Sequence, residues 1–513
     1  MPINKTAGLA TLLVASTLSA WQAHAEAPLS AIDWLSKSVN SPAVAPVPDE
    51  PAVTNNALPS DVSVSVIGKP SLDATGLLSS EVTGLPRNLW GLGLTSEIAA
   101  LVTKERTDTL PALQQLLITV LVAEADAPAD SGKGGVLLLS RIDKLLEMGA
   151  LDQANGLLTA AGSTEPDLFR RAFDVALLTG SEDAACEKMQ ASSNLAPTFP
   201  ARIFCLARSG DWNAAALALR TGQALGYVTP EDDALLSRFL DPDLYEDEPP
   251  PDPPSRPTPL IWRMFAAIGE PLATSNLPVA FAHAELQDTS GWKAQIEAAE
   301  RLAKAGAIAP DVLLALYTDR RPAASGGVWD RVDAVQDFDA ALDSGKADTL
   351  AKVLPTVWGQ MMTMELEVPF ANLFAARLAK VNLSGEAGDL AFRIGLLSAT
   401  YEKVATARTA TTVEDAFLIG LAKGNVDGIV APDSLARAIA PAFIAPAPAP
   451  DALVLLDQGR VGEAVLIAID RISRGVQGDP QGVSDGLSLL RHVGLEDVAR
   501  RTALELMLLE RRG

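Results

Sequence analysis

Apolar residues recur at three- and four-residue spacing from about residue 89 onward, a pattern typical of helices that bury one face. Alternation with period two is confined to residues 61–67, where Val62, Val64 and Val66 share one side. Long runs of β-branched residues are scarce, and aromatic residues make up only 5% of the chain. The pattern predicts an all-α protein with an extended N-terminal segment.

One unit recurs along the helical part: an apolar helix, a tight turn at a glycine, and a second helix with alanine near its start. The predicted turns lie at Gly149, Gly180, Gly210, Gly459 and Gly494. The first three are 31 and 30 residues apart, and the last two are 35 apart. Apolar helices on both sides of turns at a near-constant period predict an irregular α-solenoid of helical hairpins.

These hairpins resemble tetratricopeptide-type repeats, in which a small residue lets paired helices approach closely. The resemblance covers residues 136–240 and 451–510, and the full consensus is not reproduced. It implies a degenerate helical array, since the hairpins between the two stretches are irregular.

Two breaks divide the helical body. Residues 241–259 are acidic and dense in proline, and residues 445–450 alternate alanine with proline, so neither stretch propagates a helix. We therefore expect a signal peptide (1–25), a flexible or extended N-terminal segment (26–85), a hairpin-repeat block (86–240), an acidic linker (241–259), a second helical block (260–444) and C-terminal hairpins (445–513).

The N-terminus has the layout of a cleavable secretory signal. Lys5 precedes an apolar stretch over residues 7–20, and small residues follow at Ala23 and Ala25. The apolar stretch is shorter than the roughly 20 residues of a membrane span. We expect cleavage after Ala25 and export to the bacterial periplasm. Residues 113–123 are also apolar, but they are short and contain glutamines, which predicts a buried helix rather than a span.

The formal net charge is −23, and losing Lys5 with the signal would make it −24. Such a surface is repelled by phosphate backbones and anionic headgroups, so nucleic acid and direct membrane insertion are both disfavoured. The only cysteines are Cys186 and Cys205, 19 residues apart. In an oxidising compartment such a pair predicts a disulfide, and the alternative is two buried thiols.

No constellation for catalysis, cofactor binding or metal binding stands out. His283 and His492 have no cysteine or second histidine at ligand spacing, so both are interpreted as structural residues. The acidic run over residues 241–248 offers carboxylates for calcium but lacks the spacing of a calcium loop. The sequence thus assigns no catalytic, cofactor-binding or metal-binding residue.

The candidate partner-binding residues are two tryptophans and the valines of the extended segment. Trp329 follows a Gly-Gly loop, and Trp34 lies in a short apolar patch near the N-terminus; both are candidates for aromatic rings presented to a partner. The valines of residues 61–67 could pair with a loop of this chain or with a partner's sheet edge, or lie along the helical body. The remaining helical tryptophans are expected to anchor the core: Trp212, Trp262, Trp292 and Trp358.

These features favour a periplasmic protein–protein interaction scaffold or assembly factor for the cell envelope, with another protein as its partner and no catalysis. A subunit of a large envelope or motor complex is the first alternative. An enzyme or small-molecule binder with a site in the middle helical block is the second, and a deep pocket holding two carboxylates of raised pKa would favour it.

Overall fold

The structure, a computed structural model, describes residues 71–162, 164–192 and 194–509. All regular elements in these ranges are helical, and the nearest approach to a sheet is one isolated bridge between Leu78 and Ala123. The all-α prediction is therefore confirmed. The signal peptide, Trp34 and the three valines fall outside the described residues.

The helices follow one another in this order: η1 (Leu72–Ala74), α1 (Ser80–Thr83), α2 (Thr95–Lys104), α3 (Pro111–Val122), α4 (Val136–Glu147), α5 (Leu151–Ala161), α6 (Pro166–Thr179), α7 (Glu182–Ala191), α8 (Phe199–Arg208), α9 (Trp212–Leu225), α10 (Pro230–Leu240), η2 (Pro242–Tyr245), α11 (Pro259–Ala267), η3 (Val279–Leu286), α12 (Trp292–Lys304), α13 (Pro310–Thr318), α14 (Val328–Ser344), α15 (Ala347–Thr363), α16 (Glu367–Leu378), α17 (Gly385–Leu396), α18 (Tyr401–Ala407), α19 (Val413–Lys423), α20 (Ser434–Ile444), α21 (Pro450–Asp457), α22 (Val461–Val476), α23 (Pro480–His492) and α24 (Glu496–Leu508).

The predicted glycine turns connect consecutive helices. Gly149, Gly180 and Gly210 join α4 to α5, α6 to α7 and α8 to α9, and Gly459 and Gly494 join α21 to α22 and α23 to α24. All five adopt positive φ, between 69° and 90°, a conformation that side chains with a Cβ rarely adopt. The helix–turn–helix units read from the sequence are thus present as local structure.

Other local features also agree with the sequence pattern. Thr229 caps α10 by accepting a hydrogen bond from the Asp232 amide, and Pro230 occupies the first turn. The apolar stretch over residues 113–123 lies in α3 and the residue after it, and Gln114 is buried there. No helix in the described ranges is long and apolar enough to cross a bilayer.

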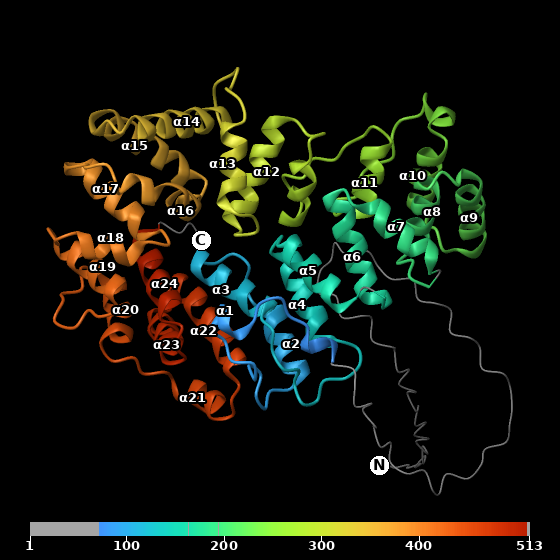
Figure 1. Ribbon diagram of the computed structural model, residues 1–513. Coiled ribbons are helices and arrows are strands. Elements are labelled where there is room, and N and C mark those ends of the chain that lie inside the picture. Colours follow the sequence, from blue (N-terminus) through green and yellow to red (C-terminus); the bar gives the residue numbers. More distant parts are fainter. Residues whose placement is uncertain (1–70, 163, 193, 510–513) are drawn as a thin grey trace, which may run out of the picture.

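The chain runs out along α4–α10, returns through α11–α13, and comes back to its starting region with α22–α24 (Figure 1). On the return, α11 packs on α6, and η3 packs on α4 and α6. His283 of η3 donates a hydrogen bond from Nε2 to the Gly149 carbonyl (2.7 Å). Burial lowers the pKa of His283 and so favours its neutral form, as a structural role requires.

At the end of the chain, α22 and α24 pack against α2 and α3; we call this contact the seam. The Trp90 side chain, 2% exposed, is buried there, and a Cβ at Gly462 would clash with its ring. The Gly462 amide donates to the Leu89 carbonyl (2.7 Å), and the Glu505 carboxylate accepts from the Ala112 amide (2.9 Å). The two ends of the described chain therefore share one core.

Candidate functional site

The outermost hairpins, α7–α9, are held together by a covalent bond. Cys186 on α7 and Cys205 on α8 form a disulfide, with a Cα–Cα distance of 5.1 Å, which confirms the predicted pairing. Both cysteines are buried. The disulfide joins α7 to α8. The next helix, α9, has an exposed outer side.

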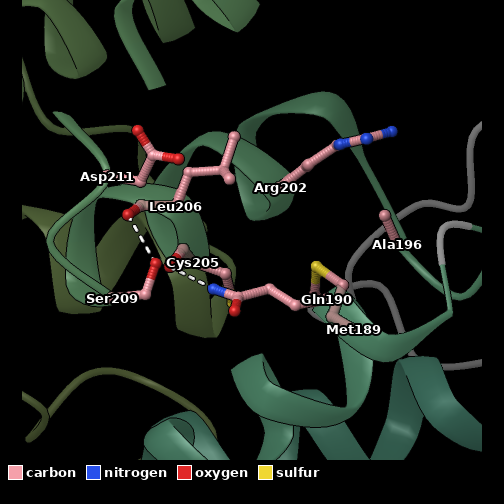
Figure 2. A pocket seen from close by; sticks show the side chains of 8 residues that line it. All are labelled: Met189, Gln190, Ala196, Arg202, Cys205, Leu206, Ser209 and Asp211. Atoms are coloured by element: carbon pink, nitrogen blue, oxygen red, sulfur yellow. Dashed lines mark hydrogen bonds between the residues drawn. The ribbon is translucent and has the colours of Figure 1, made fainter. Parts of the chain in front are cut away.

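A hollow of about 220 Å³ lies beside the disulfide (Figure 2). It runs along α8, with the end of α7 and the start of α9 as further walls. Its lining residues are Met189, Gln190, Ala196, Arg202, Cys205, Leu206, Ser209 and Asp211. The lining is mixed: four of its residues have polar or charged side chains (Gln190, Arg202, Ser209 and Asp211), and the rest are apolar or are a cysteine of the disulfide.

Most polar groups of the hollow already have partners within the protein. Gln190 Nε2 donates to the Cys205 carbonyl (3.3 Å), Ser209 Oγ donates to the Leu206 carbonyl (2.8 Å), and Asp211 caps α9 at the Ala214 amide. Arg202 is different: its guanidinium is exposed and makes no ion pair within the described residues. In Figure 2, Arg202 and Asp211 lie on opposite sides of the set of lining residues.

Next to the hollow, α9 exposes a surface of small, apolar and polar side chains with a leucine at its centre. We define the α9 face as the exposed positions at helical spacing: Asn213, Ala216, Leu217, Arg220, Thr221 and Ala224. Leu217 is 69% exposed, and Leu225 at the end of the helix is 60% exposed. The buried side of α9 is centred on Ala215 and Leu219, so the α9 face points away from α8 and α10.

The expectation that Trp212 anchors the core is wrong, because this side chain is 51% exposed. Trp212 is the first residue of α9, so its ring lies at the end of the hairpin and contacts the Phe239 ring (6.4 Å between centroids). Trp262 is buried as expected, while Trp292 and Trp358 are partly buried.

Trp329, a predicted partner-binding residue, lies in an aromatic cluster. Its ring is 5.0 Å from that of Trp292 and half-buried, and the Arg320 guanidinium lies 5.3 Å from the Trp292 ring. The structure therefore does not bring Trp329 near the α9 face. The other predicted partner-binding residues, Trp34, Val62, Val64 and Val66, are outside the described ranges.

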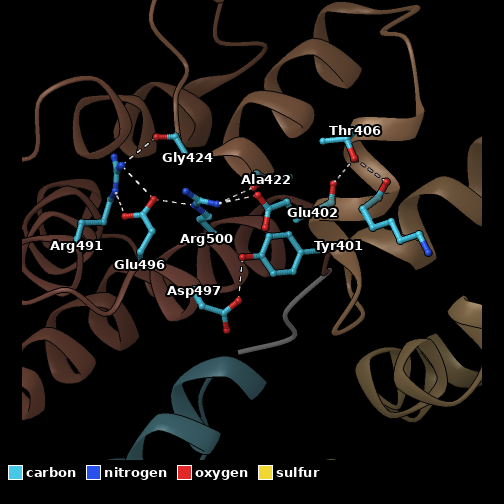
Figure 3. A network of polar contacts seen from close by, with 10 residues as sticks. Tyr401, Glu402, Thr406, Ala422, Gly424, Arg491, Glu496, Asp497 and Arg500 are labelled. Carbon is cyan, nitrogen blue, oxygen red and sulfur yellow. Dashed lines mark hydrogen bonds and ion pairs between the residues drawn. The ribbon is translucent and has the colours of Figure 1, made fainter. Parts of the chain in front are cut away.

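The most connected charged network joins the C-terminal helices to α18–α20 (Figure 3). Arg491 donates to the Gly424 and Ala442 carbonyls, at the ends of α19 and α20. Burial opposes ionisation of Glu496, but hydrogen bonds from Arg491 and Arg500 outweigh it and lower its pKa. Since its charges are paired and its donors bind helix ends, the network serves packing.

An unusual titratable group lies at the seam. Burial raises the pKa of Glu105 to about 8, and the nearby Asp470 adds to the rise, while Lys144, Lys104 and Arg474 act against it. Glu105 directly follows α2, which lies far from α7 and α8 in the fold (Figure 1). No group of three or more His, Cys, Asp or Glu within the described ranges is placed to hold a metal ion.

The hollow and the α9 face escaped the sequence analysis, although a signal existed. Residues 212–228 contain one charged residue, Arg220, so apolar and small residues must occupy the exposed side of any helix there. Which side is exposed depends on where α8 and α10 pack, which the pattern does not specify. Comparison with protein-family models, curated proteins and solved structures gives no significant match.

Proposed function

We propose that this protein is a periplasmic scaffold or assembly factor that binds another protein of the cell envelope through the α7–α9 end of its hairpin series. The observation that carries the proposal is the α9 face, an exposed helix surface on which the large apolar side chain of Leu217 is uncovered. Large apolar side chains exposed on a helical array favour contact with another protein, and Leu217 and Leu225 of α9 are both more than half exposed.

Further features support the proposal. The local resemblance to tetratricopeptide-type repeats is compatible with protein binding, and the hollow offers a recess for a partner side chain. The disulfide favours an oxidising compartment, in agreement with the signal-like N-terminus. A subunit of a large envelope complex would use the same surface and differ in having a fixed stoichiometry.

The test is site-specific photo-crosslinking in the native host. A photoreactive amino acid is placed at Leu217, and at Lys352 on α15 as a solvent-exposed control on a polar helix surface. We expect one reproducible crosslinked protein from position 217 and none from 352. The ratio of the two proteins in the native complex, purified without crosslinking, separates an assembly factor from a stoichiometric subunit.

A second arm examines the N-terminal segment. Deletion of residues 26–68 should weaken the crosslink from position 217 if the segment helps to recruit the partner. Equal crosslinking from 217 and 352, or recovery of uncrosslinked protein alone, would contradict the scaffold proposal.

A further inference from the structure

A buried carboxyl group lies where the two ends of the described chain meet. Glu105 directly follows α2 and is only 7% exposed, in the region where α22 packs on α2 and α3. The Thr109 and Ser473 hydroxyls share a hydrogen bond across the seam in the same region (2.7 Å). A carboxyl group at such a contact changes the interaction between the two ends whenever it gains or loses a proton.

The charged groups around Glu105 come from α2, α4 and α22. Lys104 lies on α2 itself, and Lys144 approaches from α4. Asp470 and Arg474 approach from α22, and the Arg474 guanidinium donates a hydrogen bond to the Asp470 carboxylate. The seam therefore places two carboxyl groups near each other, one from each end of the chain, and the arginine beside them is already paired with one of the two.

The buried ammonium group of Lys144 has no donor left for the Glu105 carboxyl group. It donates to the Thr103 carbonyl (3.0 Å) and to the backbone carbonyl of Glu105 (2.7 Å). Its third bond goes to the Glu147 carboxylate (2.6 Å). A lysine ammonium has three N–H donors, so these bonds use all of them. Among the described residues, no hydrogen bond stabilises the ionised form of the Glu105 carboxyl group.

Ionisation of Glu105 acts differently on the two sides of this contact. Towards α22, the new carboxylate is repelled by Asp470, and Arg474 offsets this only in part because it is shared. Towards α4, the carboxylate is attracted by Lys144, which also holds the end of α2 through two backbone carbonyls. In addition, α2 packs far more extensively on α4 than on α22. The side that gives way is therefore α22.

We propose that the seam contains a pH-sensitive switch, in which the proton on Glu105 holds residues 470–476 of α22 against residues 105–110, and loss of this proton at alkaline pH releases them. The hydroxyl–hydroxyl hydrogen bond across the seam breaks in the released form. The other end of α22 stays in place, because the contact between Trp90 and Gly462 is apolar and α22 remains packed on α23.

Proton binding sets the direction of the response. Burial raises the pKa of Glu105 to about 8 while α22 is in place, whereas the same group in water ionises near 4.5. The closed form thus binds the proton more tightly than the released form. Closure is fully supported below pH 4.5 and loses this support as pH rises towards 8.

The test is hydrogen–deuterium exchange of the full chain at about pH 5 and about pH 8.5, with each rate divided by that of an unstructured peptide at the same pH. We expect the protection of residues 466–476 to fall roughly thirtyfold at the higher pH. Residues 199–225, at the α7–α9 end, should keep their protection. An equal fall in both segments, or no fall in residues 466–476, would overturn the inference.

Three variants locate the cause. Glu105→Gln should remove the fall, because the amide does not titrate, and Glu187→Gln, an exposed control on α7, should keep it. Asp470→Asn should reduce the fall, because Arg474 then attracts the Glu105 carboxylate without a competing acid. Thermal unfolding at about pH 5 controls for folding of each variant. A full response in Glu105→Gln or in Asp470→Asn would contradict the switch.

This inference does not depend on what the α9 face binds. The exchange experiment uses the protein alone, so its failure would leave the scaffold proposal standing. Loss of crosslinking from position 217 would in turn leave the switch untouched.

Discussion

The seam and the α7–α9 end contain the same helix–turn–helix unit, but this unit is covered by other parts of the chain at the seam and exposed at the α7–α9 end. At the seam, the turn glycine Gly459 packs against the backbone of Gly91, and a Cβ at Gly459 would lie 3.6 Å from the Gly91 Cα. At the other end, a Cβ at Gly210 would meet nothing within 4 Å. Both turns have positive φ, so their local conformation does not explain the difference.

What differs is whether another part of the chain packs against each hairpin. The seam brings a buried tryptophan from the other end of the chain under α22, whereas the acidic, proline-rich residues 241–258 lead the chain away from α9 and back to α6. One hairpin is covered by another part of its own chain, and the other is left with Leu217 and Leu225 exposed on its outer side. The comparison predicts that equivalent substitutions will have very different effects at the two ends.

The largest contrast is expected between two tryptophans. Trp90→Ala should lower the free energy of unfolding by about 3 to 5 kcal/mol, because it opens a cavity in a buried contact. Trp212→Ala should cost under about 1 kcal/mol, since half of this ring is already in water. Urea denaturation of both variants measures the difference, and similar losses would break the comparison.

Removing the disulfide should cost roughly 3 kcal/mol, because the crosslink closes a loop of about 19 residues in the unfolded chain. The variant is Cys186→Ser with Cys205→Ser, measured by urea denaturation. Adding reductant to the wild-type protein should produce the same loss, and should have no effect on the double variant. An unchanged denaturation midpoint would show that packing alone holds α7 against α8.

The seam should weaken as pH rises. Glu105 stays protonated in the folded protein up to about pH 8 but ionises near 4.5 when unfolded, so its contribution is complete below pH 4.5 and is lost as pH rises towards 8. We expect a loss of about 2 kcal/mol, below the roughly 5 kcal/mol of the full shift, because the site can relax and admit water.

Glu105→Gln should remove this part of the pH dependence, since the amide does not titrate. The measurement is urea denaturation at about pH 5 and pH 8.5 for the wild type, for Glu105→Gln and for Glu187→Gln, an exposed control on α7. If Glu105→Gln keeps the wild-type pH dependence, the carboxyl group is not the cause.

The smallest effect on stability is expected on the α9 face itself. Leu217→Glu should change the free energy of unfolding by less than about 0.5 kcal/mol, because the side chain is exposed, yet it should abolish co-purification of the partner with the tagged protein. Leu466→Glu, at a fully buried position of α22, should prevent stable folding. A large loss of stability from Leu217→Glu would show that this face packs within the protein.

Features set by a few neighbouring residues were predictable. The glycine turns, the Thr229 cap and the helix over residues 113–123 depend on local conformation and periodicity, and the disulfide followed from a single pair of cysteines. The burial of Trp90 and the exposure of Trp212 could not be predicted from the sequence, because both depend on which distant helix packs nearby. Gly462, which admits the Trp90 ring, is more than 370 residues away from it in the sequence.

The seam also constrains the order in which the protein can fold. A chain that emerges N-terminus first, from a ribosome or a translocation channel, exposes the Trp90 site long before residue 462 arrives to cover it. Contacts of such high sequence separation form late and slow folding, and their apolar surfaces stay open to aggregation in the meantime. Completion of this fold is therefore a step that follows synthesis, and a chain lacking α22–α24 would remain a client for chaperones.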